Sequence, residues 1–337
     1  MMRHAIIALA MLVLLPVSLL SAGQPARSAG SSVYIALGDS IAAGVGSSLP
    51  RERGYPALVR DLLARQSGGN VILENLAVPG ETAASFRDGG QLSRYRDVVD
   101  RLGRGDTPIA AVTVSLGGNE MLRVSGNDSG DRQAALDAFR SAYPAVLADI
   151  RAAAGPDVPI VVTNYYDLSA GDPSIVESDS WWISRFNEVI ADAATASGAG
   201  IADVTSAFAG HIDEYTLAPY DVHPTNAGHR AIAAAVWRAL RIDTTAPTID
   251  VATTLDATRL TPTLRFLVND DTVVDGVTVE SAEAAVHGPF PTGDGEWVAL
   301  LDLAGVSGRV SVTIGATDAA GNNSTRDIVV NSTGESQ

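Results

Sequence analysis

Residues 33–40 read Val33-Tyr34-Ile35-Ala36-Leu37-Gly38-Asp39-Ser40, and this stretch predicts the fold. Five apolar residues without a helical period run into a glycine and two polar residues, a pattern typical of a buried strand that ends in a turn. Four later runs share this short, apolar character: Val71–Leu76, Ile109–Ser115, Ile160–Thr163 and Gly200–Asp203. We therefore expect about five parallel strands in the first two thirds of the chain.

Helix-like segments separate these runs. They carry apolar residues at helical spacing and comprise Tyr55–Gln66, Arg132–Ala153, Trp181–Ala196 and Ala227–Leu240. Strands that alternate with helices form a sheet that is covered on both faces. The sequence thus predicts a fold of the α/β class, with a three-layer α/β/α doubly wound domain over residues 30–242.

The composition and the periodicity of the sequence change after Asp243. Residues 249–337 are rich in Thr, Val, Gly and Asp, and apolar residues alternate at period two in Thr263–Val268, Trp297–Leu303 and Val310–Ile314. Turn-forming residues separate such runs at 269–271 and 318–322. We expect a linker at 243–248, followed by a small all-β sandwich domain that ends in a polar tail.

The first residues are typical of an export signal. Arg3 and His4 precede an apolar run from Ala5 to Leu20, and small residues follow it. The run is shorter than the roughly twenty residues that a membrane span needs, and Pro16 lies inside it. The sequence predicts a signal peptide over residues 1–29, no stable membrane insertion, and a secreted, extracellular mature protein.

Composition excludes several kinds of chemistry. The formal charge of −16 argues against a nucleic-acid partner, which needs concentrated positive charge. The chain has no Cys and no Lys, so thiol nucleophiles, disulfides, Schiff-base lysines and phosphate-loop lysines are excluded. Covalent catalysis is left chiefly to Ser, Thr or a carboxylate, and we expect no cofactor.

Polar segments follow the predicted strands where each strand ends. They are Gly38-Asp39-Ser40, residues 77–82, Gly117-Gly118-Asn119-Glu120, residues 164–167 and, beyond a longer connection, residues 221–224. In open α/β sheets, ligands bind beyond the carboxyl ends of the strands. We therefore expect these segments to meet on one rim and to form a site there.

In order and spacing, these segments resemble the blocks of the SGNH hydrolases, also called GDSL lipases and esterases. The matching blocks are Gly38-Asp39-Ser40, Asn75–Gly80, Gly117-Gly118-Asn119 and His223–His229, with Glu120 where many members carry Asp. The resemblance covers roughly residues 31–240. It implies a serine esterase or lipase that hydrolyses carboxylic esters of small molecules, lipids or carbohydrates.

Acyl transfer needs a nucleophile, a base that takes its proton, and donors aimed at the developing oxyanion. Ser40 is the candidate nucleophile and His223 the candidate general base. The resemblance implies an oxyanion hole formed by the backbone N–H groups of Ser40 and Gly80 and by the side-chain amide of Asn119. Two other interpretations remain open: Gly80 merely allows a positive φ angle, or Asn119 merely caps a strand end.

The acid that orients His223 departs from the family pattern. That pattern, Asp-x-x-His, places the acid three residues before the histidine, where this chain has Tyr220. The nearest acid is Asp221, two residues before His223, and we expect it to take this role in a Ser-His-Asp triad. Asp213 or a backbone carbonyl could orient the ring instead, which would leave a Ser-His dyad.

The other candidate residues receive a structural interpretation. We expect His211 and His229 to be structural, and no metal site, because no two histidines share the i, i+4 spacing of a helical ligand pair. Trp181 and Trp182 could flank an acyl or sugar pocket or pack in the core. No long apolar stretch suggests a large lid, which favours short- or medium-chain esters as substrates.

The C-terminal region carries a second resemblance. Asp-Thr-Thr-Ala-Pro-Thr-Ile at 243–249 and Ala-Thr-Asp-Ala-Ala-Gly-Asn at 316–322 resemble stretches of bacterial immunoglobulin-like modules. Such a module implies contact with a cell surface or a polysaccharide. A second hypothesis is therefore a non-catalytic cell-wall or polysaccharide binding protein built on a degenerate hydrolase domain, and the shifted acid at Asp221 is the sequence feature that favours it.

Overall fold

The computed structural model describes residues 31–126, 128–251, 261–271 and 273–333. The predicted signal peptide and the end of the polar tail lie outside these ranges. The first part of the chain contains one sheet of five parallel strands in the order β2-β1-β3-β4-β5. The strands are β1 (Ser32–Gly38), β2 (Val71–Asn75), β3 (Ile109–Ser115), β4 (Ile160–Thr163) and β5 (Gly200–Ala202). They reproduce the five predicted runs to within one residue at each end.

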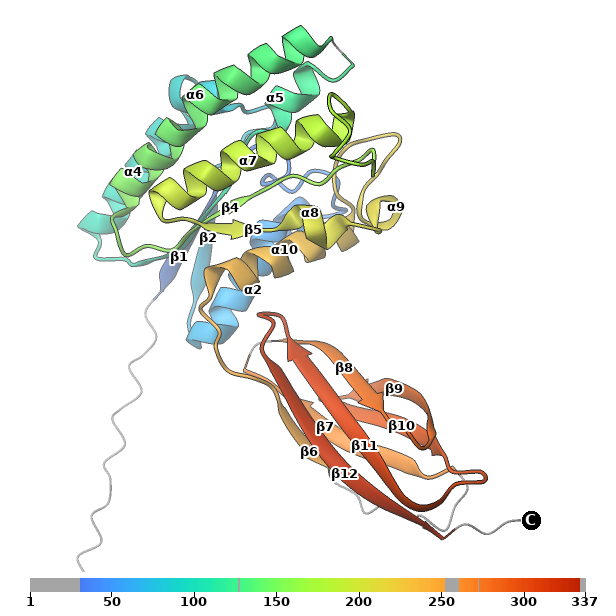
Figure 1. The fold of residues 1–337 in the computed structure, drawn as a ribbon. Helices are drawn as coiled ribbons and strands as arrows, with labels where there is room; N and C mark the ends of the chain where they lie inside the picture. The colour runs from blue at the N-terminus through green and yellow to red at the C-terminus, as the bar shows by residue number, and fades with distance from the viewer. Residues whose placement is uncertain (1–30, 127, 252–260, 272, 334–337) are drawn as a thin grey trace, which may run out of the picture.

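Helices cover both faces of this sheet (Figure 1). One layer contains α3, α4, α6 and α7, and the opposite layer contains α2 and α10. The bounds of the helices are α1 (Pro50–Arg53), α2 (Tyr55–Ser67), α3 (Ala83–Asp88), α4 (Gln91–Arg104), α5 (Gly118–Arg123), α6 (Ser129–Ala154), α7 (Asp179–Ser197), α8 (Val204–Phe208), α9 (Ile212–Tyr215) and α10 (Asn226–Leu240). The predicted α/β/α layering is confirmed. No helix in the described ranges is long and apolar enough to cross a membrane.

The strand order places a crevice at one edge of the sheet. From β1 the chain crosses to β2 on one side and then returns to β3 on the other, so the order reverses between β1 and β3. Both strands are almost fully buried, and the hydroxyl groups of Tyr34 and Thr113 join them at 2.7 Å. In this topology ligands bind at the carboxyl ends of the strands beside the switch point. The segments that begin at Asp39 and Leu116 therefore border the crevice.

The C-terminal part is built only from antiparallel strands. One sheet has the order β6-β7-β10-β9 and the other β12-β11-β8. The strands are β6 (Thr248–Val251), β7 (Thr263–Asn269), β8 (Val274–Glu280), β9 (Ala285–Gly293), β10 (Glu296–Asp302), β11 (Ser307–Asp318) and β12 (Asn323–Thr333). Side chains of both sheets, among them Phe266, Leu301 and Ile314, form a separate buried core. The predicted all-β region is confirmed, and its kinship to immunoglobulin-like modules stays a prediction.

The two parts of the chain meet at the stretches that stood out in the sequence. The side-chain amide of Asn322 donates hydrogen bonds to the carbonyl oxygens of Thr245 (3.1 Å) and Asp243 (3.4 Å). Ala319 is buried and packs with the core of the α/β part. The turn between β11 and β12 is thus joined directly to the segment that follows α10.

Candidate active site

The turn that presents Ser40 is shaped by the two residues before it. Gly38 has a φ of +127°, and a Cβ atom there would lie 2.0 Å from the carbonyl oxygen of Ser115, so only glycine fits. Asp39 is buried, and its Oδ1 accepts the backbone N–H of Ile41 at 3.0 Å. This bond bridges Ser40 and folds the chain into a tight turn directly after β1. The sequence Gly-Asp-Ser therefore fixes where the Ser40 hydroxyl lies.

The structure brings Ser40 together with two residues that are distant from it in the sequence. The Oγ atom of Ser40 lies 2.8 Å from Nε2 of His223. On the other side of the ring, Nδ1 of His223 lies 2.6 Å from Oδ1 of Asp221. The His223 side chain is 20% exposed and that of Asp221 is 45% exposed. A hydroxyl, an imidazole and a carboxylate in this order form a relay that can take a proton from the hydroxyl.

His223 is held by the loop between α9 and α10. The backbone N–H of Leu217 donates to the carbonyl of His223 at 2.9 Å, and Thr216 forms an isolated bridge with Pro224. Thr225 caps the N-terminus of α10 by accepting the N–H of Gly228, which ends the loop two residues after His223. The loop therefore has a defined shape at both ends.

A close approach between this loop and the segment after Ser40 requires Gly46. Its φ is +92°, and a Cβ atom would lie 2.3 Å from the carbonyl oxygen of Pro224 and 2.9 Å from Cβ of His223. Any other residue would push the His223 loop away from Ser40. The sequence analysis did not single out this glycine, because its partner lies about 180 residues away in the chain.

The acid position of the family pattern is occupied by a surface residue. Tyr220 is 95% exposed, whereas Asp221 contacts His223 through both the ring and the backbone N–H (3.2 Å). Burial acts to raise the pKa of Asp221, but hydrogen bonds from the His223 ring and backbone outweigh it and hold this pKa below its usual value. Within the described ranges Asp213, the alternative acid, forms no hydrogen bond with His223.

Ser40 and Asn119 line a pocket, whereas Gly80, the third expected oxyanion donor, is outside its wall. Among the described residues, no group accepts the backbone N–H of Ser40 or of Gly80. Asn119 uses one amide hydrogen to bind the carbonyl oxygen of Glu81 at 2.8 Å, which leaves its second hydrogen for another acceptor. Gly80 has a φ of +85° and open space where a Cβ would lie, so it is its conformation and not crowding that favours glycine.

Helix α5 also holds the segment after β2. Besides the Asn119 contact, Oε1 of Glu120 accepts the backbone N–H of Ala83 at 2.7 Å, and burial raises the pKa of Glu120. Both side chains thereby fix the chain just after Gly80. Glu120 fills the position where the family pattern often has Asp, and its longer side chain reaches the start of α3.

A buried polar cluster under the Ser40 turn was not predicted. The Tyr165 hydroxyl donates to Oδ2 of Asp39 at 2.5 Å, and burial raises the pKa of Asp39 to about 6. Gln91, fully buried in α4, donates to the carbonyl of Gly38 and accepts its N–H at 2.9 and 2.7 Å. These contacts join the Ser40 turn to the segment after β4 and to α4. Their donors and acceptors are paired only in the folded chain, so local sequence patterns did not reveal them.

Comparison with known proteins agrees with this arrangement. The GDSL-like Lipase/Acylhydrolase family matches residues 36–231, which is more than half of the chain. The chain belongs to this family. Membership supports ester hydrolysis. The matched range includes the four segments that contain Ser40, Gly80, Asn119 and His223. A comparison with curated protein sequences gives no match.

Comparison with solved structures gives matches to a lipase and to an esterase. A lipase from a goat rumen metagenome is 24% identical with a TM-score of 0.50, and the match covers 63% of this chain and 100% of that one. An acetylxylan esterase from Geobacillus stearothermophilus is 19% identical with a TM-score of 0.49, over 64% of this chain and 97% of that one. At 24% identity the likeness to the rumen lipase concerns the α/β fold alone.

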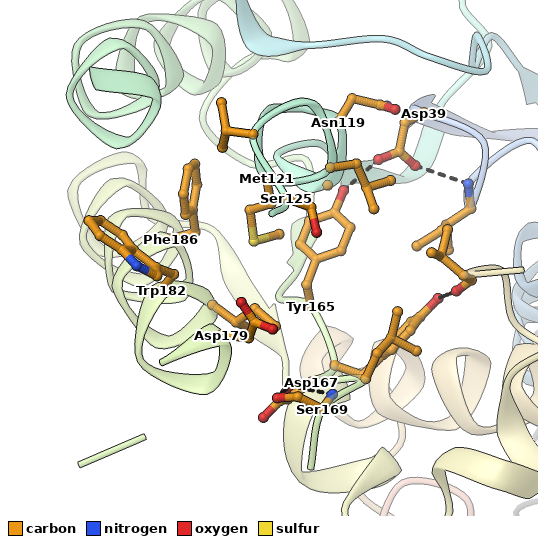
Figure 2. A pocket seen from close by; sticks show the side chains of 18 of the residues that line it. Asp39, Asn119, Met121, Ser125, Tyr165, Asp167, Ser169, Asp179, Trp182 and Phe186 are labelled. Atoms are coloured by element: carbon orange, nitrogen blue, oxygen red, sulfur yellow. Dashed lines mark hydrogen bonds between the residues drawn. The ribbon is translucent and has the colours of Figure 1, made fainter. Parts of the chain in front are cut away.

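The GDSL-like domain has a pocket that opens at Ser40. About 180 Å³ of it is accessible to the centre of a water molecule, and its wall includes Ser40, Asn119 and His223. Figure 2 shows Trp182 and Phe186 across the pocket from Asp39, with Met121 between them. Trp182 is only 6% exposed, so it both lines the pocket and packs in the core. Trp181 is partly buried against the same core and does not line the pocket.

His229 and His211 lie outside this pocket. In His229, Nδ1 accepts the backbone N–H of Tyr55 (3.2 Å) and Nε2 donates to the carbonyl of Val45 (3.0 Å). Burial lowers the pKa of His229 to about 4, so the ring is neutral and joins α10 to α2 and to the segment after Ser40. His211 stacks on Tyr215 at the surface. These contacts agree with the structural interpretation of both residues.

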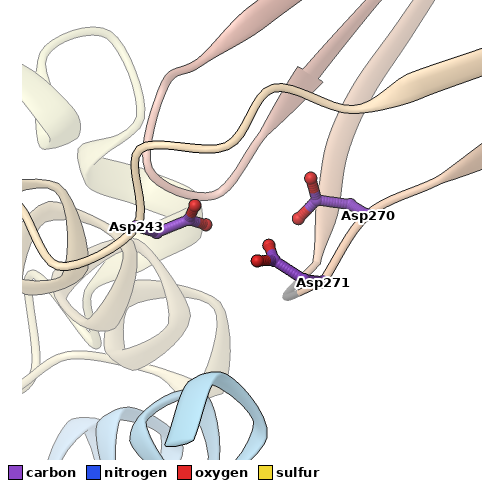
Figure 3. Close-up of side chains that lie close together, drawn as sticks. All are labelled: Asp243, Asp270 and Asp271. Carbon is purple, nitrogen blue, oxygen red and sulfur yellow. The ribbon is translucent and has the colours of Figure 1, made fainter. Parts of the chain in front are cut away.

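Away from the pocket, three carboxylates lie together. One oxygen each of Asp243, Asp270 and Asp271 falls within 4.8 Å of the others, at the junction of the two parts (Figure 3). In the described ranges this is the one group of side chains with spacing suited to a metal ion, and carboxylates suit a hard cation such as Ca²⁺. Sequence spacing did not reveal it, because the linker and the turn after β7 meet only in the fold. None of the three lines the pocket at Ser40.

Proposed function

We propose that this GDSL-like hydrolase cleaves carboxylic esters through an acyl-enzyme on Ser40. The observation that carries the proposal is the continuous chain of contacts from Ser40 Oγ to His223 Nε2 (2.8 Å) and from His223 Nδ1 to Asp221 Oδ1 (2.6 Å). His223 takes the proton of Ser40 as the hydroxyl oxygen attacks the carbonyl carbon. Asp221 keeps the ring in the tautomer that has a free Nε2 and stabilises the imidazolium that forms.

The oxyanion of the tetrahedral intermediate is bound by three donors. The N–H groups of Ser40 and Gly80 have no acceptor within the described part of the chain, and Asn119 has a second amide hydrogen to offer. Donors that are already in place stabilise the developing charge without reorganisation. His223 then passes its proton to the leaving alcohol, and a water molecule, activated by the same imidazole, releases the acid and restores Ser40.

We also propose that the enzyme acts outside the cell. The support is the apolar run from Ala5 to Leu20, its basic start and the small residues after it. The separate C-terminal core supports the proposal that the all-β part is an immunoglobulin-like module that contacts a cell surface or polysaccharide. Retention of the full chain on insoluble cell-wall polysaccharide tests this contact.

The alternative of a non-catalytic binding protein loses its main support. The shifted acid favoured that alternative in the sequence, but Asp221 reaches His223 from its shifted position. The two functions are separated by turnover of p-nitrophenyl esters by the purified protein. We expect hydrolysis by the wild type, a loss of roughly a millionfold in Ser40→Ala, and wild-type rates in Ser67→Ala. Equal rates in the wild type and Ser40→Ala would contradict the proposal.

A further inference from the structure

The pocket continues from Ser40 as a slot between two helices. Met121 and Leu122 come from α5, and Trp182, Ile183 and Phe186 come from the first half of α7. All five side chains are apolar over most of their surface, and Phe186 is 1% exposed. A ligand that reaches from Ser40 into this slot therefore meets a hydrophobic wall on both sides.

The ionised and phenolic groups along the wall are already bound within the protein. Asp167 accepts hydrogen bonds from the hydroxyls of Ser169 and Ser180. The Tyr165 hydroxyl binds Asp39. Sites that recognise sugars need convergent polar groups that are free to bind the ligand. These side chains are engaged elsewhere, so the slot suits an aliphatic chain better than a sugar.

An ion pair borders the slot on the side of α6 and α7. Nη1 of Arg132 lies 2.7 Å from Oδ1 of Asp179, and the Arg132 side chain is only 14% exposed. Contact between an aliphatic chain and this ion pair does not stabilise binding. Each methylene that moves from water onto the apolar side chains of α5 and α7 does lower the free energy of binding. The favourable wall is therefore the one formed by Met121, Ile183 and Phe186.

We propose that this slot binds the acyl chain of the substrate, so that the enzyme prefers esters of aliphatic acids well beyond acetate. The inference rests on the proposed function and names the substrate class of that site. About 180 Å³ of the pocket is accessible to the centre of a water molecule, which is more room than an acetyl group fills. Each buried methylene should raise kcat/KM about threefold to fourfold.

The slot suits the acyl group and not the alcohol, because the alcohol must leave the site and be replaced by water. His223 gives its proton to the leaving alcohol, and water must then reach the same carbonyl carbon. The His223 side chain is 20% exposed, so this side of the site meets solvent. Trp182 and Phe186 are buried in the pocket wall across from Asp39, where a bound chain can stay while the alcohol is exchanged for water.

The test is a chain-length series of p-nitrophenyl esters from acetate to octanoate. We expect kcat/KM of the wild type to be about tenfold or more higher for octanoate than for acetate. Ile183→Trp, and independently Met121→Trp, should fill the slot and lower this octanoate-to-acetate ratio by about tenfold or more. Ile175→Trp, on the exposed loop before α7 and outside the pocket wall, is the matched control and should keep the wild-type ratio.

Three results would overturn the inference. The first is a wild type that hydrolyses esters and is labelled at Ser40 but does not discriminate between acetate and octanoate; it contradicts the slot and leaves the proposed function intact. The second is a series of alkyl acetates in which Ile183→Trp lowers turnover of octyl acetate relative to ethyl acetate, since the slot would then hold the alcohol. The third is absence of turnover with every ester, which contradicts the proposed function and this inference together.

Discussion

The Nδ1 atom of His223 lies 2.6 Å from Oδ1 of Asp221, and a single residue separates the two in the sequence. The same Oδ1 accepts the backbone N–H of His223 at 3.2 Å. One carboxylate oxygen thus fixes both the ring and the backbone of the histidine. The acid acts from within the same short loop, so the shape of residues 216–224 determines the orientation of the imidazole.

Replacement of Asp221 with alanine should lower kcat roughly 10²- to 10⁴-fold. The ring would lose the acceptor that selects its tautomer, and nothing would stabilise the imidazolium. Steady-state kinetics on p-nitrophenyl butyrate measures the effect, with circular dichroism to verify folding. Asp213→Ala is the control and should retain wild-type kcat; a large loss in Asp213→Ala with near-normal Asp221→Ala would show that Asp213 orients the ring.

Replacement of Asn119 with alanine should lower kcat roughly 10²- to 10³-fold and change KM little. The amide is expected to bind the oxyanion, which exists only in the transition state and intermediate. It also binds the carbonyl oxygen of Glu81, so the stability of the variant must be measured in parallel. A variant that loses stability but keeps kcat would assign Asn119 to the fold and not to the oxyanion hole.

Gly46→Ala should impair both stability and activity. The residue has a φ of +92°, which costs about 1–2 kcal/mol for an L-residue, and the new methyl group would collide with Pro224 beside His223. We expect kcat to fall about tenfold to a hundredfold as the His223 loop shifts. Gly68→Ala is the matched control, since Gly68 has a φ of +60° with open space around it. It lacks the collision, so it should lose only the conformational part of the stability that Gly46→Ala loses, and it should keep wild-type kcat.

His229 should make the fold sensitive to acid. Its pKa in the folded chain is about 4, below the ordinary value of 6.5, so its contribution to stability is present above pH 6.5 and is lost as pH falls toward 4. Asp39 acts in the opposite direction: with its pKa raised to about 6, its contribution is present below the ordinary value of 3.8 and is lost as pH rises through 6. The two effects oppose each other between pH 4 and 6.

A His229→Gln variant separates these effects. Glutamine keeps a donor for the carbonyl of Val45 but does not titrate. On going from pH 7.5 to 4.5, the variant should lose about 2–3 kcal/mol less free energy of unfolding than the wild type, as measured by urea denaturation. Parallel stability curves for the two proteins across this range would contradict the assignment of a neutral, buried His229.

Much of the α/β fold could be predicted because its strands are short and rich in apolar residues, and β1, β3 and β4 are largely buried. The five predicted runs correspond to β1–β5, since a strand covered on both faces leaves a continuous apolar signal. Helix α4 was missed although Leu92, Tyr95, Val98 and Leu102 are buried at helical spacing. The many Arg and Asp residues between these apolar residues made the helical pattern hard to recognise in the sequence. Strands β8 and β9 were also missed, because most of their side chains are exposed and the alternation is weak.

The candidate site could be predicted where its residues belong to local segments. Ser40, Gly80, Asn119 and His223 each follow a strand or precede a helix, so topology alone places them on one rim. The contact between Asp221 and His223 depended on the path of one loop, which no spacing rule specifies. The support beneath Ser40 from Tyr165 and Gln91 could not be predicted, because a single sequence does not show which distant residues pair.

The central claim is that Ser40 is a nucleophile activated by His223. Its most direct test is reaction of the folded protein with a serine-directed fluorophosphonate, followed by peptide mapping of the adduct. We expect one adduct on Ser40 in the wild type, strongly slowed labelling in His223→Ala, and none in Ser40→Ala. An unlabelled Ser40 in the folded protein, or an adduct on a different serine that accompanies loss of activity, would contradict it.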